Sequence, residues 1–262
     1  MKDEKEIKNL KELTYTDVAK NFEDWKIAVI PWGAIEPHGE HLPYLTDSIL
    51  ASTFAELSVE AVNLIPELRN KFICLPCISM GLQNLGQVDK DFCINFSLNT
   101  QYQVIEDIIV SLQSQEIKKL VIINGHNGND FKPIVRDFAV KYPNFKIYVC
   151  DYLSIVDLMR NQGIVNFPDI DDHAAFTETS LMLYHHKNYV NEEYMEDAIK
   201  NDDHPVHEKQ PNGVIWSPRN FDKYSHFNRI GKIKGASSLN GELISNFIRK
   251  NIVDSLIKVY YE

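Results

Sequence analysis

The stretch that decides the fold of this 262-residue chain reads Pro31-Trp-Gly-Ala-Ile-Glu-Pro-His-Gly-Glu-His-Leu-Pro-Tyr-Leu-Thr-Asp47. It follows an apolar run, 27–30, with the pattern of a buried strand, and it precedes a segment, 48–64, whose apolar residues recur at helical spacing. The strand-to-helix loop between them contains five ionisable side chains: Glu36, His38, Glu40, His41 and Asp47. Carboxylates and imidazoles without cysteine suit a divalent ion such as Zn, Mn or Fe(II). We therefore interpret the loop as a cluster of metal ligands.

Each of these side chains also has a simpler interpretation. In an extended segment Glu36 and His38 project to the same side, because side chains alternate along a strand. Asp47 stands where the helix should start, so it either caps the helix or binds a metal. Glu40 is a candidate hydrogen-bond acceptor for a metal-bound imidazole. His41 is either part of the site or a buried structural histidine.

The composition is that of an ordinary globular protein, with 44% hydrophobic and 24% charged residues. We expect a single domain over residues 1–262. The net charge is -10 and no dense Lys/Arg cluster occurs, which argues against nucleic acid as a partner. The first residues are too charged for a signal peptide, and no apolar run approaches the roughly 20 residues of a membrane helix. We therefore expect no membrane contact and a cytoplasmic location.

Cys74 and Cys77 have the C-x-x-C spacing found in redox and zinc sites. The residues after Cys77 do not start a helix, as a thioredoxin-type pair would require, and no second pair completes a four-thiolate zinc site. We interpret both as buried strand cysteines.

Strand and helix patterns alternate along the chain, which predicts a three-layer α/β/α sandwich with a mainly parallel sheet. The expected strands are 25–30, 71–76, 120–123 and 145–150, and the expected helices are 13–22, 48–64, 100–115, 131–141, 155–161 and 239–261. In such sheets ligands bind beyond the carboxyl ends of the strands. The loop 31–47 and the turn 124–129 both follow expected strands, so we expect them to converge.

Two further polar groups complete the pattern. The turn Asn124-Gly-His-Asn-Gly-Asn129 contains His126, and the stretch 171–180, which we expect to open a helix ending near 185, contains Asp172, His173 and Glu178. Residues 188–236 are polar and irregular in pattern, as active-site covers and subunit contacts often are. His204 and His207 in that stretch have ligand-like spacing, but we interpret them as solvated.

In this order, Glu36-Pro-His38-Gly-x-His-Leu-Pro with Asp47, Asn124-Gly-His126-x-Gly-Asn129, and His173 with Glu178-Thr-Ser resemble the creatininase (creatinine amidohydrolase) family of metal-dependent amide hydrolases. The resemblance implies a creatininase-like α/β/α fold, a homohexamer, and one or two divalent ions (Zn, Mn or Fe). It implies that Glu36, Asp47 and His126 bind one ion, and that His38 and the bridging Asp47 bind the second. It further implies that Asp172 and His173 flank the reacting amide and that Glu178 lies close to the metals.

Three features depart from creatininase itself. Gly128 occupies the position of a glutamate that binds the second metal, which leaves Glu178 as a candidate replacement. No tryptophan occurs between residues 33 and 215, where creatininase holds the creatinine ring, and the loop 81–96 lacks the usual Glu-His pair. The turn motif is closer to the formamide hydrolases and the mycofactocin peptidase of the same family.

The sequence therefore predicts a metal-dependent hydrolase that cleaves a C–N bond (amide, cyclic amide or formamide) of a small molecule with a metal-bridged hydroxide. His173, with an ordinary pKa near 6.5, is the expected proton carrier, and Asp172 or Glu178 would take the proton from water. Two alternatives stay open: the formamide hydrolase or peptidase branch of the family, and a metal-binding scaffold without catalysis. A serine hydrolase is excluded, because no Gly-x-Ser-x-Gly motif occurs.

Overall fold

The computed structural model describes residues 9–200, 218 and 220–262. Its strands are β1 (Ile27–Trp32), β2 (Phe72–Cys74), β3 (Lys119–Asn124), β4 (Lys146–Asp151), β5 (Asp171–His173) and β6 (Ile230–Gly231). Its α-helices are α1 (Tyr15–Asn21), α2 (Thr46–Asn63), α3 (Leu98–Ser114), α4 (Lys132–Lys141), α5 (Tyr152–Arg160), α6 (Phe176–His185), α7 (Glu192–Lys200), α8 (Phe221–Tyr224) and α9 (Ser238–Tyr261).

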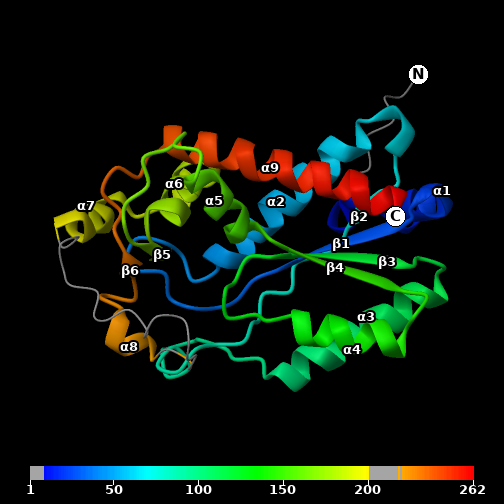
Figure 1. The fold of residues 1–262 in the computed structure, drawn as a ribbon, viewed down its shortest axis with the longest axis horizontal. Helices are drawn as coiled ribbons and strands as arrows, with labels where there is room; N and C mark the ends of the chain where they lie inside the picture. Colours follow the sequence, from blue (N-terminus) through cyan, green and yellow to red (C-terminus); the bar gives the residue numbers. More distant parts are fainter. Residues whose placement is uncertain (1–8, 201–217, 219) are drawn as a thin grey trace.

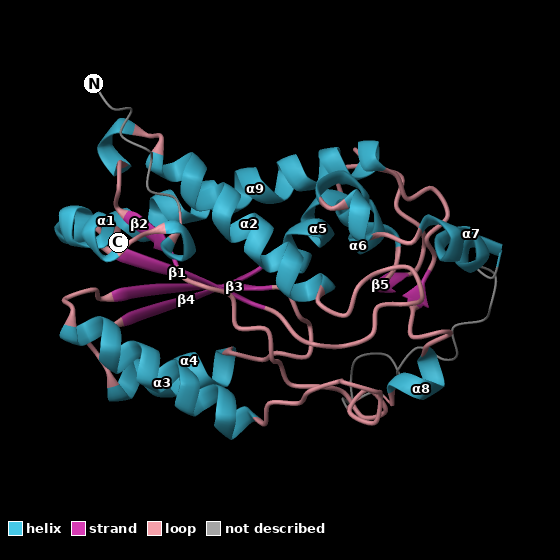
Figure 2. Ribbon diagram, turned by 180° about the vertical axis from the view of Figure 1, so that it is seen from behind, coloured by secondary structure: helices cyan, strands magenta, loops and turns pink. Residues whose placement is uncertain are grey.

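The main sheet has the strand order β2-β1-β3-β4, and all of its pairings are parallel. Helices α3 and α4 lie against one face, and α2, α5, α6 and α9 lie over the other (Figures 1 and 2). This arrangement confirms the predicted α/β/α sandwich. The expected strands and helices are present, with ends that shift by a few residues.

Alternation along β1 explains the two apolar layers. Ile27 and Val29 face the cluster formed with α2, α5, α6 and α9, whereas Ala28 and Ile30 face the cluster formed with α3 and α4. Every residue of β1 is therefore buried, as the continuous apolar run predicted for a strand covered on both faces. Helices α3 and α9 begin at serine caps: Ser97 accepts the backbone N–H of Thr100, and Ser237 accepts that of Asn240.

The strand order reverses between β1 and β3, since β1 leads to a neighbour on one side and β3 lies on the other. Open α/β sheets bind ligands at such a switch point, beyond the carboxyl ends of the strands. Trp32 and Asn124 are paired in register at these ends. The loop after β1 and the turn after β3 consequently leave the sheet side by side, as expected.

Two sequence expectations were wrong in detail. Asp171–His173 does not open a helix but forms β5, which pairs antiparallel with β6, and α6 starts only at Phe176. The stretch 188–236 is not irregular throughout, because α7 occupies Glu192–Lys200. Asn191 accepts the backbone N–H of Tyr194, and two glutamates in the first turn complement the helix dipole.

The cysteines are free, and in the C-x-x-C pair Cys74 is buried whereas Cys77 is partly exposed. Burial raises the pKa of Cys74 to about 12 and also raises that of Cys77. Redox cysteines need a lowered pKa, so the structural interpretation of the pair is supported. None of the helices in the described part of the chain combines the length and apolar character that a membrane crossing requires.

Candidate metal centre

The first group of donor atoms joins the loop after β1, the start of α2 and the turn after β3. Nδ1 of His126 lies 2.9 Å from Oδ2 of Asp47 and 3.2 Å from Oε1 of Glu36. Nε2 of His126 donates to the carbonyl oxygen of Leu82 at 2.9 Å. In the neutral tautomer that this bond selects, the lone pair of Nδ1 points at the two carboxylates. Three buried donors converge here in the manner of a divalent cation site.

The turn that holds His126 has no room for side chains at its glycines. A Cβ on Gly125 would lie 2.5 Å from the carbonyl oxygen of Asp47, and one on Gly128 would lie 2.3 Å from Nε2 of His126. A Cβ on Gly128 would also lie 2.2 Å from the carbonyl oxygen of Leu82. The glutamate that creatininase carries at this position would therefore displace the carbonyl that orients His126. Asn124 stabilises the same turn by accepting the backbone N–H of His126 and donating to Asp151.

The second group uses the other oxygen of Asp47. Nδ1 of His38 donates to the backbone carbonyl of Glu36 at 3.0 Å, so Nε2 carries the lone pair in the neutral ring. This Nε2 lies 2.9 Å from Oδ1 of Asp47 and 3.8 Å from Oε1 of Glu178. Asp47 thus presents one oxygen to each imidazole. Glu178 is the third possible donor of this second group.

Asp47 does not cap helix α2. The helix starts one residue earlier, at Thr46, and its N-cap position is Leu45, which makes no side-chain cap hydrogen bond. The Asp47 side chain is 2% exposed and points at His38 and His126. The carboxylate in the first turn therefore faces the cluster of imidazoles and carboxylates and not the helix end.

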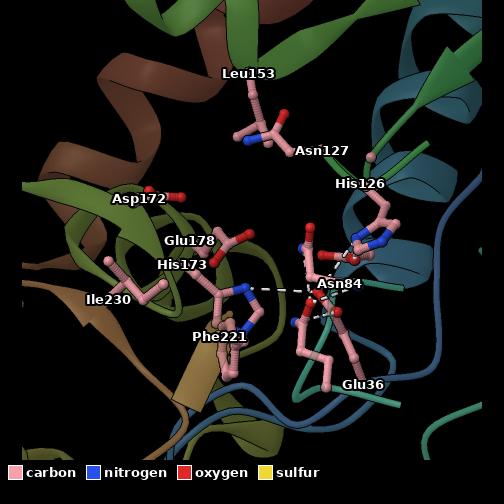
Figure 3. Close-up of a pocket in the computed structure, with 14 residues that line it drawn as sticks. Glu36, Asn84, His126, Asn127, Leu153, Asp172, His173, Glu178, Phe221 and Ile230 are labelled. Carbon is pink, nitrogen blue, oxygen red and sulfur yellow. Dashed lines mark hydrogen bonds and ion pairs between the residues drawn. The ribbon is translucent and has the colours of Figure 1, made fainter. Parts of the chain in front are cut away.

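His173 reaches the same centre from β5. Its Nε2 donates to the carbonyl oxygen of Pro37 at 2.8 Å, and its Nδ1 lies 3.5 Å from Oε1 of Glu36. Figure 3 shows the His173 ring turned toward Glu36. The ring packs on His38, with centroids 4.3 Å apart, and receives the edge of Phe221 at 5.2 Å. Only 11% of the side chain is exposed, so the alternative of a solvated helix-start histidine is wrong. Glu36, His38 and His173 also form a third possible set of cation donors.

The charges of these buried groups depend on one another. Burial alone would lower the pKa of His38, but Asp47, together with Glu178 and Glu36, raises it to about 10. The pKa of His126 is raised well above its ordinary value, because Glu36 and Asp47 outweigh its burial. Burial opposes ionisation of Asp47, yet His38 and His126 hold its pKa far below the usual range. Burial raises the pKa of Glu178 to about 8. Without a bound cation, protons on His38, His126 and Glu178 therefore offset the negative charges of the buried carboxylates.

One buried oxygen is left without a hydrogen bond. Oδ2 of Asp47 is inaccessible to water, and no donor reaches it while His126 is in its neutral tautomer, although Nδ1 of His126 lies 2.9 Å away. Buried polar atoms in native proteins nearly always have partners. A carboxylate oxygen and a ring nitrogen that face each other without a hydrogen bond fit a cation that both would bind.

A small polar pocket opens over this centre, and a larger cavity adjoins it. The pocket is lined by Glu36, Asp47, His126, His173 and Glu178 among others (Figure 3). The adjoining cavity has a volume of about 340 Å³ and shares Asn127, Leu153, Asp172 and Glu178 with the pocket. Asp172 thus stands at the boundary between the two spaces. Its catalytic role remains a prediction.

Two residues of the first loop do not take part in the centre. Glu40 is exposed, and the backbone carbonyl of Glu36 takes the hydrogen bond from His38 that Glu40 was expected to accept. His41 is buried and bonds through Nε2 to the Thr179 hydroxyl at 2.8 Å, and burial lowers its pKa to about 4. His41 is therefore the structural histidine. His204 and His207 lie outside the described residues.

Sequence reasoning missed three neighbours of the centre: Gln87, whose amide contacts Glu36, the Leu82 carbonyl that orients His126, and the Phe221 ring against His173. All three come from segments with no recognisable motif. A backbone carbonyl leaves no trace in a sequence, so Leu82 could not have been found in this way.

Comparison with known proteins agrees with this geometry. The family model Creatininase, described as creatinine amidohydrolase, matches residues 11–256. The chain belongs to this family. An inferred creatinine amidohydrolase from Bacteroides fragilis has the same fold, with a TM-score of 0.82 at 31% identity over 95% of each chain. A creatininase variant complexed with creatine gives a TM-score of 0.75 at 20% identity, over 98% of this chain and 99% of that one.

Two kinds of curated creatininase-family relative also match. Creatinine amidohydrolase of Pseudomonas putida is 24% identical over 247 residues, which is 88% of each chain. The mycofactocin precursor peptide peptidase of Mycobacterium tuberculosis is 26% identical over 167 residues, and the match spans 57% of the peptidase and 60% of this chain. Other creatininase structures of this fold are described as a Zn-Zn type and as an Mn form.

Proposed function

We propose that this protein is a metal-dependent hydrolase that cleaves a C–N bond, of the amide, cyclic amide or formamide type, in a small molecule. The observation that carries the proposal is the arrangement around Asp47, whose two oxygens face two imidazoles, each oriented by a backbone carbonyl. Such an arrangement fits two divalent ions that share one carboxylate. Membership of the creatininase family supports the reaction class.

We assign the first ion to Glu36, Asp47 and His126, and the second to His38, Asp47 and Glu178. Three carboxylates in a buried site compensate most of the charge of two divalent ions. Zn, Mn and Fe(II) all accept carboxylate and imidazole ligands, so the ligand set does not select among them. When bound, such ions lower the pKa of a shared water and polarise a carbonyl oxygen.

The side chains around the ions would handle the protons. Because Nε2 of His173 already donates to the Pro37 carbonyl, only Nδ1 is free to accept or give a proton, and it faces the centre. Burial and the neighbouring His38 lower the pKa of His173, which leaves the ring neutral and basic at neutral pH. We assign to His173 the delivery of a proton to the leaving nitrogen. Glu178 and Asp172 are the remaining candidates for accepting the first proton from water.

The space beside the centre argues for a substrate larger than creatinine. The cavity of about 340 Å³ falls within the range of ligand pockets, roughly 300–1,000 Å³. Its walls are polar and include Ser154, Asp157, Arg160 and Thr177. Flat ring recognition needs aromatic faces, and none of the described residues that line this cavity is aromatic, whereas Phe221 lines the smaller pocket over the centre. A peptide-like or formamide substrate therefore suits the site better than creatinine, and the similarity to the mycofactocin peptidase supports the same view.

The test combines metal analysis with a hydrolysis screen. Protein purified without chelator should contain about two equivalents of Zn, Mn or Fe per chain, as a two-metal site requires. After loading with Zn or Mn, it should hydrolyse formamides or short peptides faster than creatinine. A creatinine kcat/KM of about 10⁴ M⁻¹s⁻¹ or more, the ordinary enzyme range, would refute the substrate proposal. Protein that binds metal but hydrolyses nothing in the screen would favour the metal-binding scaffold.

A further inference from the structure

A buried glutamine contacts the candidate ligand Glu36 from the side opposite the imidazoles. Gln87 lies in the loop between β2 and α3 and is 1% exposed. Its Nε2 donates to Oε2 of Glu36 at 2.5 Å. The other oxygen of Glu36, Oε1, is the one that lies 3.2 Å from His126 and 3.5 Å from His173. One carboxylate oxygen thus faces the centre and the other faces the amide.

The orientation of the Gln87 amide is determined by a second residue. Its Oε1 accepts the side-chain N–H of Asn84 at 2.8 Å and the backbone N–H of Asn84 at 3.3 Å. Amide oxygen and nitrogen are assigned from their hydrogen-bond partners, and two donors on one side require the oxygen to be there. The nitrogen must then face Glu36, so the amide can only donate to the carboxylate.

The loop that carries Gln87 is anchored at several points. The Leu85 carbonyl accepts the backbone N–H of Phe221 at 2.7 Å, and Lys90 forms an ion pair with Asp222 at 2.5 Å. Gly86 has a φ of 87°, and a Cβ there would lie 2.8 Å from the Asn220 side chain. The loop is therefore packed tightly against α8, which limits how far Gln87 can move from Glu36.

We propose that Gln87 is a positioning residue, which holds Glu36 so that a single oxygen is presented to the first metal ion. This role rests on the proposed function. A neutral donor suits the task, because it orients the carboxylate without adding a positive charge that would repel a cation. Carboxylate ligands in metal sites are commonly hydrogen-bonded in this way, and loss of such a contact weakens metal binding about 10–100-fold. Without the amide, Glu36 would be free to turn both oxygens toward the ion.

The test compares Q87M with a matched control from the same loop. Methionine keeps the length and apolar volume of glutamine but cannot donate a hydrogen bond. The control is Q83M, since Gln83 Nε2 donates to the backbone carbonyl of Ile35 at 3.4 Å and not to a carboxylate. The probes are Zn²⁺, titrated against a chromophoric chelator, and Co²⁺, whose visible absorption reports the geometry of its ligands. Circular dichroism and thermal melts of each metal-free variant establish that it is folded.

Q87M should bind Zn²⁺ about 10–100-fold more weakly than the wild type and should show an altered Co²⁺ spectrum. Q83M should resemble the wild type in both measurements. If Q87M does not fold, N84A replaces it, because loss of the Asn84 side chain removes the shorter of the two hydrogen bonds that orient the amide while Gln87 stays in place. N84A should weaken binding in the same direction.

The outcomes separate this role from the function on which it rests. Wild-type protein that binds neither Zn²⁺ nor Co²⁺ would overturn the proposed function and this role together. Wild-type protein that binds both ions, with Q87M or N84A equal to it in affinity and spectrum, would overturn the role of Gln87 alone. Equal losses in Q83M and Q87M would also overturn it, since they would trace the effect to the loop and not to the carboxylate contact.

Discussion

Asp47→Asn should abolish the stabilisation of this protein by metal. Asparagine keeps the shape of the side chain, but it has one oxygen where Asp47 has two, each 2.9 Å from an imidazole nitrogen. Its amide nitrogen cannot bind a cation and would face one of these rings. A single substitution therefore removes the negative charge that both groups of donors share, and it also removes the oxygen ligand of one of them.

The size of the effect follows from ligand linkage. A metal ion at 100 times its Kd stabilises the folded state by about 2.7 kcal/mol. For a chain of this size each kcal/mol raises the Tm by about 2–4 °C, so the wild type should gain roughly 5–11 °C. Loss of contacts that merely orient a ligand costs up to about 100-fold in affinity, and loss of a bridging ligand should cost at least that much. At the same metal concentration D47N would then gain about 0.4 kcal/mol, or roughly 1–2 °C.

Differential scanning fluorimetry with and without Zn²⁺ or Mn²⁺ measures this directly. The matched control is D171N, because Asp171 is also a buried carboxylate, paired with Arg160 and with Thr177. D171N should lower the Tm of the metal-free protein and keep the metal-dependent rise. The reasoning is refuted if D47N gains as much as the wild type on addition of metal.

Three further predictions concern pH, catalysis and assembly. The metal-free protein should lose stability as the pH rises from about 6.5 to 10 in urea titrations: the raised pKa of His38, about 10, stabilises the fold fully only below about pH 6.5, and the raised pKa of Glu178, about 8, adds a cost of ionisation that grows up to about pH 8. A stability that rises across this range would contradict the pairing of these groups. H173Q should lower kcat by about 10²–10⁴-fold while bound metal, measured by elemental analysis, stays at the wild-type level; loss of metal would instead make His173 a ligand. Light scattering at micromolar concentration should show a closed homo-oligomer, a hexamer by family resemblance, and a monomer alone would exclude this assembly.

The sequence predicted the layers of the fold and the convergence of its motifs because both follow from local patterns. Three features could be recognised without a structure: the continuous apolar run of β1, the ligand-bearing loop that follows it in the chain, and the turn around His126. What the pattern could not show is how each side chain is oriented. Whether Asp47 caps a helix or faces two imidazoles depends on where α2 begins, and that is decided by packing against the turn after β3.

The missed features share a physical cause. Gln87 lies in a loop without periodicity, and its role depends on a contact with Glu36 across 51 positions of sequence. β5 was mistaken for a helix start because the strand with which it pairs, β6, lies far along the chain, at Ile230–Gly231. Contacts between distant segments cannot be read from local residue patterns. Near this site, such contacts determine how the side chains are oriented.

The donors of the candidate centre come from three parts of the chain that meet at one edge of the sheet: the β1–α2 connection, the β3–α4 turn and α6. His38 and Asp47 are near neighbours in sequence, but His126 and Glu178 join them only after the strands have assembled in register. An unfolded chain therefore offers a cation at most three neighbouring ligands, Glu36, His38 and Asp47, of the five assigned to the two ions. Full loading must follow folding, and a bound ion would tie together segments from both sides of the switch point, so that it would oppose opening of the sheet.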